Sequence, residues 1–102
     1  MGAIKANNYS NQELEISMIA RGLAHPARVK ILNQLQKRVY RNIDFCRELR
    51  MNRSTIKEHL DKLIDADLIS VEYFPHFYVL SLNEERMKAV KQLMNSGDMP
   101  LS

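Results

Sequence analysis

Hydrophobic residues recur every three or four positions in five separate parts of the chain. This spacing places them on one face of an α-helix, so each part is predicted to form an amphipathic helix. The predicted helices cover residues 11–23, 26–35, 43–49, 53–64 and 84–95. Ser10 and Glu13 form a predicted capping box before the first helix, and Asn42 and Asn83 are predicted to cap the third and the last.

Three shorter segments follow a strand pattern instead. Residues 39–40 suit a brief strand, and residues 68–74 and 77–82 are rich in Ile, Val, Tyr and Phe. Pro75 and His76 lie between the last two segments and predict a hairpin turn. The fold is therefore predicted to be mainly α with a small β-hairpin (α+β), in the order α-α-β-α-α-β-β-α. We expect one domain over residues 10–96, with flexible tails at 1–9 and 97–102.

The third and fourth helices are joined by about three residues, which is typical of a helix-turn-helix. The second helix of this motif enters the major groove of DNA and presents its outward residues to base edges. The residues predicted to contact base edges are Arg53, Ser54, Lys57 and Glu58. The residues predicted to contact phosphates are Thr55, Lys62, Arg50 and Arg47.

The distribution of charge supports this interpretation. The chain has 102 residues and a net charge of +3, but residues 21–62 hold eleven bases and only four acids. A basic segment between mildly acidic ends is expected of a protein that binds a polyanion such as double-stranded DNA. A solvated basic face without a partner is the alternative that charge alone leaves open.

Two segments resemble a known family. LAHPARVKIL at residues 23–32 and MNRSTIKEHLDKLIDADLI at residues 51–69 are similar to the helix-two and recognition-helix signatures of ArsR-type winged-helix repressors. The resemblance implies a winged helix-turn-helix and a homodimeric repressor whose subunits join through the first and last helices. The residues it implies for dimerisation are Leu14, Met18, Met87, Val90, Leu93 and Met94.

The sequence departs from the family pattern in the turns and in the hairpin, which is the wing. Arg50 and Asp67 stand where relatives have Gly, at sites that favour a positive φ. Relatives carry Arg or Lys in the wing, whereas here no base occurs between Lys62 and Arg86. We expect the wing's aromatic residues, at 73–78, to pack on the domain or on the partner subunit, with minor-groove contact as the alternative.

No metal site or cofactor is expected. The family's metal sensors carry a Cys-x-Cys pair whose positions fall here at Arg41 and Ile43, and the predicted last helix has no His or Cys. The three histidines, His25, His59 and His76, are too far apart in sequence for ligand spacing. His59 is expected to flank the recognition helix, with DNA contact as the alternative.

Cys46 is the single cysteine. It is expected to be an inert, buried thiol, with a redox switch of the helix-turn-helix as the alternative. No catalytic motif is present, so an enzyme is not expected. The chain lacks a secretory signal and a membrane-spanning run, so we expect it in the cytoplasm. The alternative function is a protein–protein interaction module that docks its partner through the aromatic wing.

Overall fold

The computed structural model describes residues 8–96, and it describes side chains as far as residue 92. The predicted tails therefore lie almost wholly outside the described residues. The elements are α1 (Asn11–Gly22), α2 (Pro26–Leu35), β1 (Tyr40–Arg41), α3 (Asn42–Leu49), α4 (Arg53–Asp65), β2 (Ile69–Tyr73), β3 (Tyr78–Leu82) and α5 (Glu84–Ser96). This order confirms the predicted fold class and the boundaries to within a few residues.

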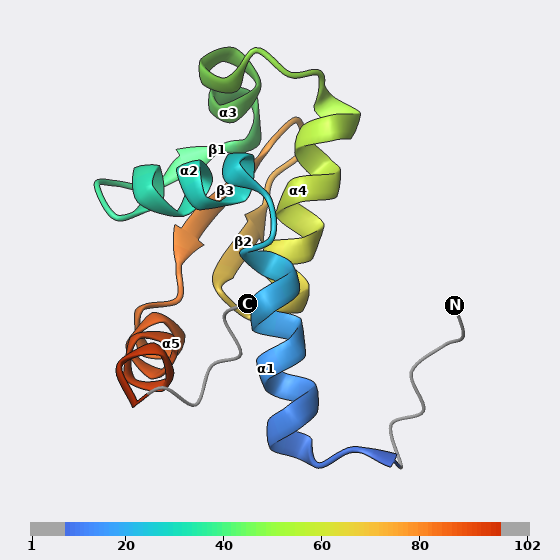
Figure 1. Ribbon diagram of the computed structural model, residues 1–102. Coiled ribbons are helices and arrows are strands. Elements are labelled where there is room, and N and C mark those ends of the chain that lie inside the picture. Colours follow the sequence, from blue (N-terminus) through green and yellow to red (C-terminus); the bar gives the residue numbers. More distant parts are fainter. Residues whose placement is uncertain (1–7, 97–102) are drawn as a thin grey trace.

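The three strands form one small antiparallel sheet in the order β1-β3-β2 (Figure 1). Leu80 in the middle strand pairs with Tyr40 on one side and with Val71 on the other. The hairpin is closed at its tip by the Phe74 N–H, which donates to the carbonyl oxygen of Phe77 at 2.9 Å. Because β1 pairs with Val79 and Leu80, it joins the start of α3 to the middle strand of the sheet.

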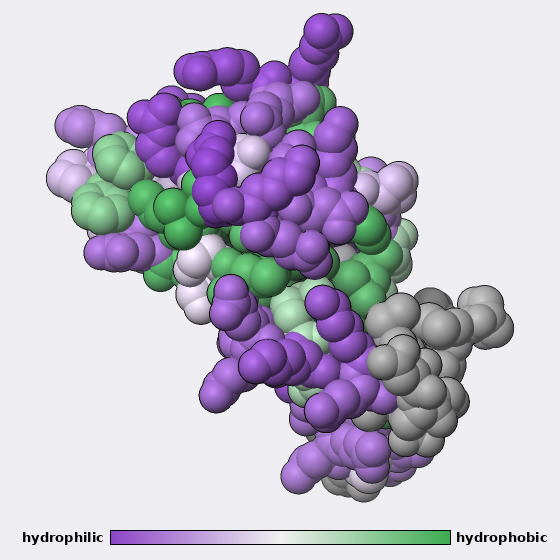
Figure 2. All heavy atoms as spheres, turned by 90° about the vertical axis from the view of Figure 1, so that its left-hand side faces the viewer, coloured by the Kyte–Doolittle hydropathy of each residue, from purple (hydrophilic) through white to green (hydrophobic). Residues whose placement is uncertain are grey.

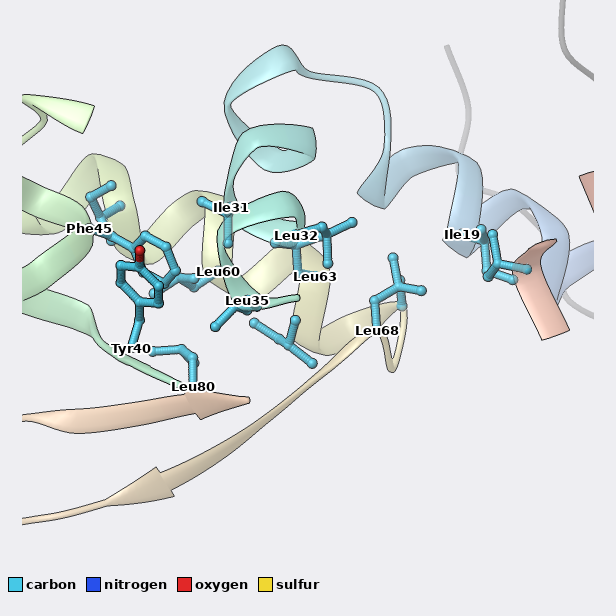
Figure 3. Close-up of a cluster of buried hydrophobic side chains, with 14 residues drawn as sticks. Ile19, Ile31, Leu32, Leu35, Tyr40, Phe45, Leu60, Leu63, Leu68 and Leu80 are labelled. Carbon is cyan, nitrogen blue, oxygen red and sulfur yellow. The ribbon is translucent and has the colours of Figure 1, made fainter. Parts of the chain in front are cut away.

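A single hydrophobic core joins the sheet to the helices. Figure 3 shows the ring of Tyr40 beside that of Phe45, and the two rings stack with their centroids 4.7 Å apart. Leucines and isoleucines from α2 and α4 fill the space between these rings and Leu68. The buried hydrophobic side chains are Ile19, Ala27, Ile31, Leu32, Leu35, Tyr40, Phe45, Ile56, Leu60, Leu63, Ala66, Leu68, Ile69, Leu80 and Val90.

Asn42 does not cap α3 as predicted. Arg41 occupies the N-cap position, and Asp44 accepts hydrogen bonds from the backbone N–H and the guanidinium of Arg41. Asn42 is instead the first residue of the helix, and its side chain is buried. Its Oδ1 accepts the backbone N–H of Tyr78 at 3.1 Å, which joins α3 to the hairpin across 36 residues of sequence.

The residues at the two turns predicted to need a positive φ, Arg50 and Asp67, both adopt a positive φ. Arg50 ends α3 at φ 54° and ψ 46°, and Asp67 follows α4 at φ 59°. Asn83 supports the second turn, because its Nδ2 donates to the Asp67 carbonyl at 2.9 Å. The Oδ1 of Asn83 accepts the Arg86 N–H, which confirms Asn83 as the cap of α5. The capping box of Ser10 and Glu13 is also present.

The helix-turn-helix and the two outer helices lie at opposite ends of the molecule. In Figure 1, α3 and the start of α4 lie at the top, whereas α1 and α5 lie at the bottom. Figure 2 views the side on which α5 lies, and there hydrophobic side chains form an interrupted band between two largely hydrophilic regions. No helix within residues 8–96 is long and apolar enough to cross a membrane.

The side chain of α1 that the core buries completely is Ile19, and Ile16, Ala20 and Leu23 pack beside it. At Gly22 the helix passes close to the end of α4, since a Cβ there would lie 3.2 Å from the Ala66 Cβ. This close approach fixes where α1 leaves the body of the domain.

Asn42→Ala tests the link between α3 and the hairpin. The substitution leaves the Tyr78 N–H without its acceptor, so we expect the free energy of unfolding to fall by about 1–3 kcal/mol in urea denaturation. Asn33→Ala, at an exposed position of α2, is the matched control and should change little. Equal stability losses in the two variants would show that the Asn42 hydrogen bond is not structurally important.

Candidate nucleic-acid interface

The fourth helix, α4, has one apolar edge and one polar flank. Ile56, Leu60 and Leu63 are each at most 1% exposed and pack into the core. The polar flank of α4 is defined here by its four exposed residues that were predicted to contact base edges: Arg53, Ser54, Lys57 and Glu58. The core therefore holds this flank toward solvent, where the chain itself does not cover it.

The first turn of α4 is organised by Asn52, which is the N-cap residue. The Oδ1 of Asn52 accepts the backbone N–H of Thr55 at 2.8 Å and the hydroxyl of Ser54 at 2.9 Å. Ser54 is thus held in place, while both lone pairs of its hydroxyl oxygen stay available to outside donors. Thr55 is half-buried, so it presents less of its side chain than the residues of the polar flank.

Lys57 is not a free cation in this conformation. Its Nζ lies 2.7 Å from Asp61 Oδ2 one helical turn later, and this hydrogen bond raises the pKa of Lys57. The spacing of four residues between Lys57 and Asp61 is a sequence signal for such an ion pair on a helix. Both side chains are exposed, so the pair is weak and a stronger acceptor on DNA can replace Asp61.

Arg47 and Arg50 are both exposed. Arg47 lies in the last turn of α3, and Arg50 is the C-cap residue in the turn that leads to α4. Neither these two nor Arg53 forms an ion pair with another residue of the described part of the chain. Lys62 is also exposed but lies nine residues after Arg53, or about 14 Å along the helix. The predicted phosphate contacts therefore fall into a group at the turn and one separate residue.

A groove separates the start of α4 from the wing tip. Arg53, Ser54 and Lys57 line it on the helix side, Asn42 lies at its base, and residues 73–78 line it on the hairpin side. Burial raises the pKa of Tyr78, which is half-buried beside Asp61 and Lys57. The groove thus brings three predicted base contacts together with the aromatic wing.

The wing's aromatic rings are less covered than predicted. Tyr73 is 72% exposed and Phe74 is 42% exposed. They pack mainly on their neighbours across the hairpin, with 5.6 Å between the ring centroids of Tyr73 and Tyr78 and 5.0 Å between those of Phe74 and Phe77. Tyr73 and Phe74 therefore do not pack on the body of their own domain, because a short hairpin tip extends beyond the core; packing on the partner subunit, the other half of the expectation, stays a prediction.

His59 lies on the buried side of α4, only 8% exposed. Its Nδ1 lies 3.2 Å from Arg28 Nη1, and its ring centroid is 4.5 Å from that of His25. Arg28 also donates to the backbone carbonyls of Gly22 and Arg21 at the end of α1. This cluster joins α1, α2 and α4, so the alternative of a DNA contact by His59 is wrong. Sequence spacing did not reveal the cluster.

The positions aligned with a family metal pair hold no ligands. Arg41 pairs with Asp44 at 3.0 Å, and the hydrogen bond from Arg41 holds the pKa of Asp44 below its ordinary value. Within the part of the chain that the structure describes, no three His, Cys, Asp or Glu side chains gather as a metal site. Cys46 is half-buried against the core, and its redox role stays a prediction.

The predicted dimerisation residues divide into three groups. Leu14 and Met18 of α1 are half-buried and lie outside the core cluster, so they remain accessible to a partner. Val90 is 2% exposed and belongs to the chain's own core, so its assignment to the dimer surface is wrong, and Met87 packs partly against that core. The side chains of Leu93 and Met94 lie outside the described residues.

Comparison with known proteins supports the interpretation from geometry. Residues 25–71 match the family model described as "Bacterial regulatory protein, arsR family". An HTH-type transcriptional regulator of Methanocaldococcus jannaschii is 36% identical over 56 residues, which are 55% of this chain and 59% of that protein. The aligned region thus spans less than two thirds of this relative.

Solved structures show the same fold. An ArsR-like transcriptional regulator from Rhodococcus sp. RHA1 superposes with a TM-score of 0.72 at 18% identity, covering 87% of this chain and 85% of that one. The homodimeric winged helix-turn-helix DNA-binding domain of a Mycobacterium bovis protein gives a TM-score of 0.72 at 16% identity, covering 100% and 94%. The fold of this chain is therefore a winged helix-turn-helix.

The His59 cluster predicts a pH-dependent stability. Burial lowers the pKa of His59, and the neighbouring His25 and Arg28 lower it further, so the folded protein favours the neutral ring. The unfolded chain takes up this proton near pH 6.5, and the free energy of unfolding should therefore fall as the pH drops below about 6.5. Above that pH the effect should vanish.

His59→Asn retains a hydrogen-bond acceptor for Arg28 but cannot be protonated in this range. We expect its urea denaturation midpoint to change less than that of the wild type between about pH 7 and pH 5. His76→Asn, at the exposed wing tip, serves as the control and should follow the wild type. An unchanged pH dependence in His59→Asn would contradict the assignment.

Proposed function

We propose that this chain is a transcriptional regulator of the arsR family, whose model matches residues 25–71, and that it binds double-stranded DNA sequence-specifically as a homodimeric repressor. The polar flank of α4 lies in the major groove. Arg53, Ser54, Lys57 and Glu58 contact base edges there, and the exposed arginines of the turn contact phosphates.

The observation that carries this proposal is the orientation of α4. Its apolar edge is fully buried, and its polar flank is exposed over more than one helical turn. Arginine and lysine donate to guanine O6 and N7, and glutamate accepts from cytosine N4, so the flank has the chemistry for direct reading of bases. Arg47 and Arg50 beside it supply the positive charge that attracts the DNA backbone.

Self-association is supported by the opposite end of the molecule. Leu14 and Met18 of α1 are half-buried and are left outside the core, so they can be covered by a second copy of the chain. A two-fold dimer through this end would present two copies of α4 about one DNA turn apart. We propose that the repressor has no metal-sensing site, because Arg41 and Ile43 occupy the positions of the Cys-x-Cys pair that binds metal in the family's metal sensors. We place the protein in the cytoplasm with its DNA.

The second candidate function is a protein-docking module. The exposed Tyr73 and Phe74 favour it, because large exposed aromatic side chains are typical of docking surfaces. A protein-docking module need not bind DNA in a salt-dependent way, whereas a DNA-binding regulator must.

The proposal is tested by selecting duplexes from a random-sequence library with the wild-type protein and titrating the enriched duplex and random duplexes at several salt concentrations. We expect the enriched duplex to bind at least about 1,000-fold more tightly than random DNA, with affinity falling steeply as salt rises. No enrichment, together with salt-independent or absent binding, would leave only the protein-docking candidate.

The same titrations separate base contacts from phosphate contacts. Lys62→Ala should weaken binding to all duplexes alike and flatten the salt slope by about one unit, because it removes one phosphate contact. Arg53→Ala should relax the preference at one base position of each half-site, which a second round of library selection measures. Equal losses on enriched and random duplexes for both variants would contradict this division.

Arg50→Gly should change stability and binding in opposite directions. Glycine adopts φ 54° without strain, so we expect the free energy of unfolding to rise by about 1 kcal/mol. Loss of the guanidinium should weaken DNA binding and flatten the salt slope by about one unit. Arg50→Lys keeps the charge and should keep the slope. If the salt slope of Arg50→Gly were the same as that of the wild type, Arg50 would not contact DNA phosphates.

A further inference from the structure

We propose that the wing tip is an uncharged wedge that enters the minor groove, opens one base step of the bound duplex and bends the DNA. The wedge is formed by Phe74 and Pro75, supported by Phe77. This inference rests on the proposed function, since it requires α4 to lie in the neighbouring major groove. It concerns what the hairpin does once the duplex is bound.

The tip is exposed and rigid. Phe74 is 42% exposed, and its N–H donates to the Phe77 carbonyl oxygen at 2.9 Å, which closes the turn. Its ring stacks on that of Phe77 with an interplanar angle of 16°. Pro75 restricts the backbone between them. The aromatic pair is therefore already ordered before binding, so little conformational entropy is lost on insertion.

The tip is also fixed relative to α4. Asn42, at the start of α3, accepts the N–H of Tyr78 at 3.1 Å, and the Arg41 guanidinium lies 5.9 Å from the ring centroid of Phe77. Asn42 begins α3 and Arg41 is its N-cap residue, so both contacts join the hairpin to the start of α3, which packs on α4 in the helix-turn-helix. The distance between the wing tip and the polar flank of α4 is thereby set by the fold.

The groove between α4 and the wing has the chemistry to receive one DNA strand. Arg53 and Lys57, which are proposed to contact base edges, line one wall and give it positive charge that attracts the DNA strand, and aromatic residues line the other wall. A helix lying in the major groove is bordered by a sugar–phosphate backbone, beyond which the minor groove begins. With that backbone seated between α4 and the hairpin, Phe74 and Pro75 lie over the minor groove.

The wing's composition indicates how it acts there. No Lys or Arg occurs between Lys62 and Arg86, and Glu72 adds a negative charge to β2, so the hairpin gains nothing from attraction to phosphates. Minor-groove proteins that use Phe or Pro insert them between base pairs and kink the duplex by about 20–90°. Pyrimidine–purine steps such as TA and CA open most easily, so we expect such a step beneath the wing.

The test measures DNA bending and base unstacking with the duplex that wild-type protein enriches from a random library. End-to-end fluorescence energy transfer reports the bend, and 2-aminopurine placed at successive steps reports unstacking. Wild type should bend the duplex by at least about 20° and brighten 2-aminopurine at one step per half-site. Phe74→Ala should abolish both signals and weaken binding by roughly tenfold.

The salt slope separates the wedge from an electrostatic contact. Because Phe74 carries no charge, Phe74→Ala should leave the salt slope unchanged, whereas Arg50→Gly flattens it. Phe74→Leu keeps an apolar wedge and should keep most of the bend. Val39→Ala is the matched control, since Val39 is 57% exposed in the connection between α2 and β1, and it should match the wild type.

Thermal unfolding of each variant followed by circular dichroism verifies that the domain remains folded. The wedge proposal would be wrong if a folded Phe74→Ala variant bent DNA as the wild type does, or if the wild type bound DNA without bending or unstacking it. Either result would leave the proposed DNA-binding function intact. Absence of any duplex binding would overturn the proposed function as well. If Phe74→Ala altered only self-association or capture of a protein partner, the wing would be a docking surface and the wedge would be wrong.

Discussion

The burial of one edge of α4 is the constraint on which the rest of the structure depends. Ile56, Leu60 and Leu63 are enclosed by side chains from the other helices and the sheet. Burying each such side chain contributes about 1.5–3 kcal/mol, so a rotation of α4 that exposed all three would cost roughly 5 kcal/mol or more. The polar flank therefore faces outward for a reason that lies in the core.

The position of the wing and of the turn relative to that helix depends on a hydrogen bond and on one backbone conformation. Asn42 joins the hairpin to α3, and Arg50 makes the sharp turn into α4 in a left-handed backbone conformation, which is strained for a residue with a side chain. A glycine would make the turn with less strain. An exposed arginine at this place adds positive charge beside the polar flank, which suits a surface for a polyanion. Binding and self-association then use opposite ends of the molecule (Figure 1).

The sequence was sufficient to predict the elements, because each has a local signal. Apolar spacing marks the edge of α4, Ser10 and Glu13 mark the start of α1, and the change to a strand pattern marks the hairpin. The two left-handed turns were also predictable, because the family resemblance identified positions that favour glycine.

The remaining features depend on contacts between residues far apart in sequence. Asn42 has the local pattern of a cap, yet its partner lies 36 residues away. His59 has the spacing of a flanking residue, but α2 brings Arg28 against it and makes it part of the interior. Val90 has the same apolar character as a dimer contact, and only the packing shows that it belongs to the core. Periodicity identifies an apolar face without identifying what covers it.

The most direct test of the central claim, that the outward flank of α4 meets duplex DNA, is the change in backbone amide chemical shifts on titrating the enriched duplex into isotope-labelled protein. We predict that the largest changes gather in the turn around Arg50, along the first two turns of α4 and at the wing tip, with small changes in the exposed parts of α1. Changes concentrated on α1 or α5, with α4 unaffected, would contradict the claim.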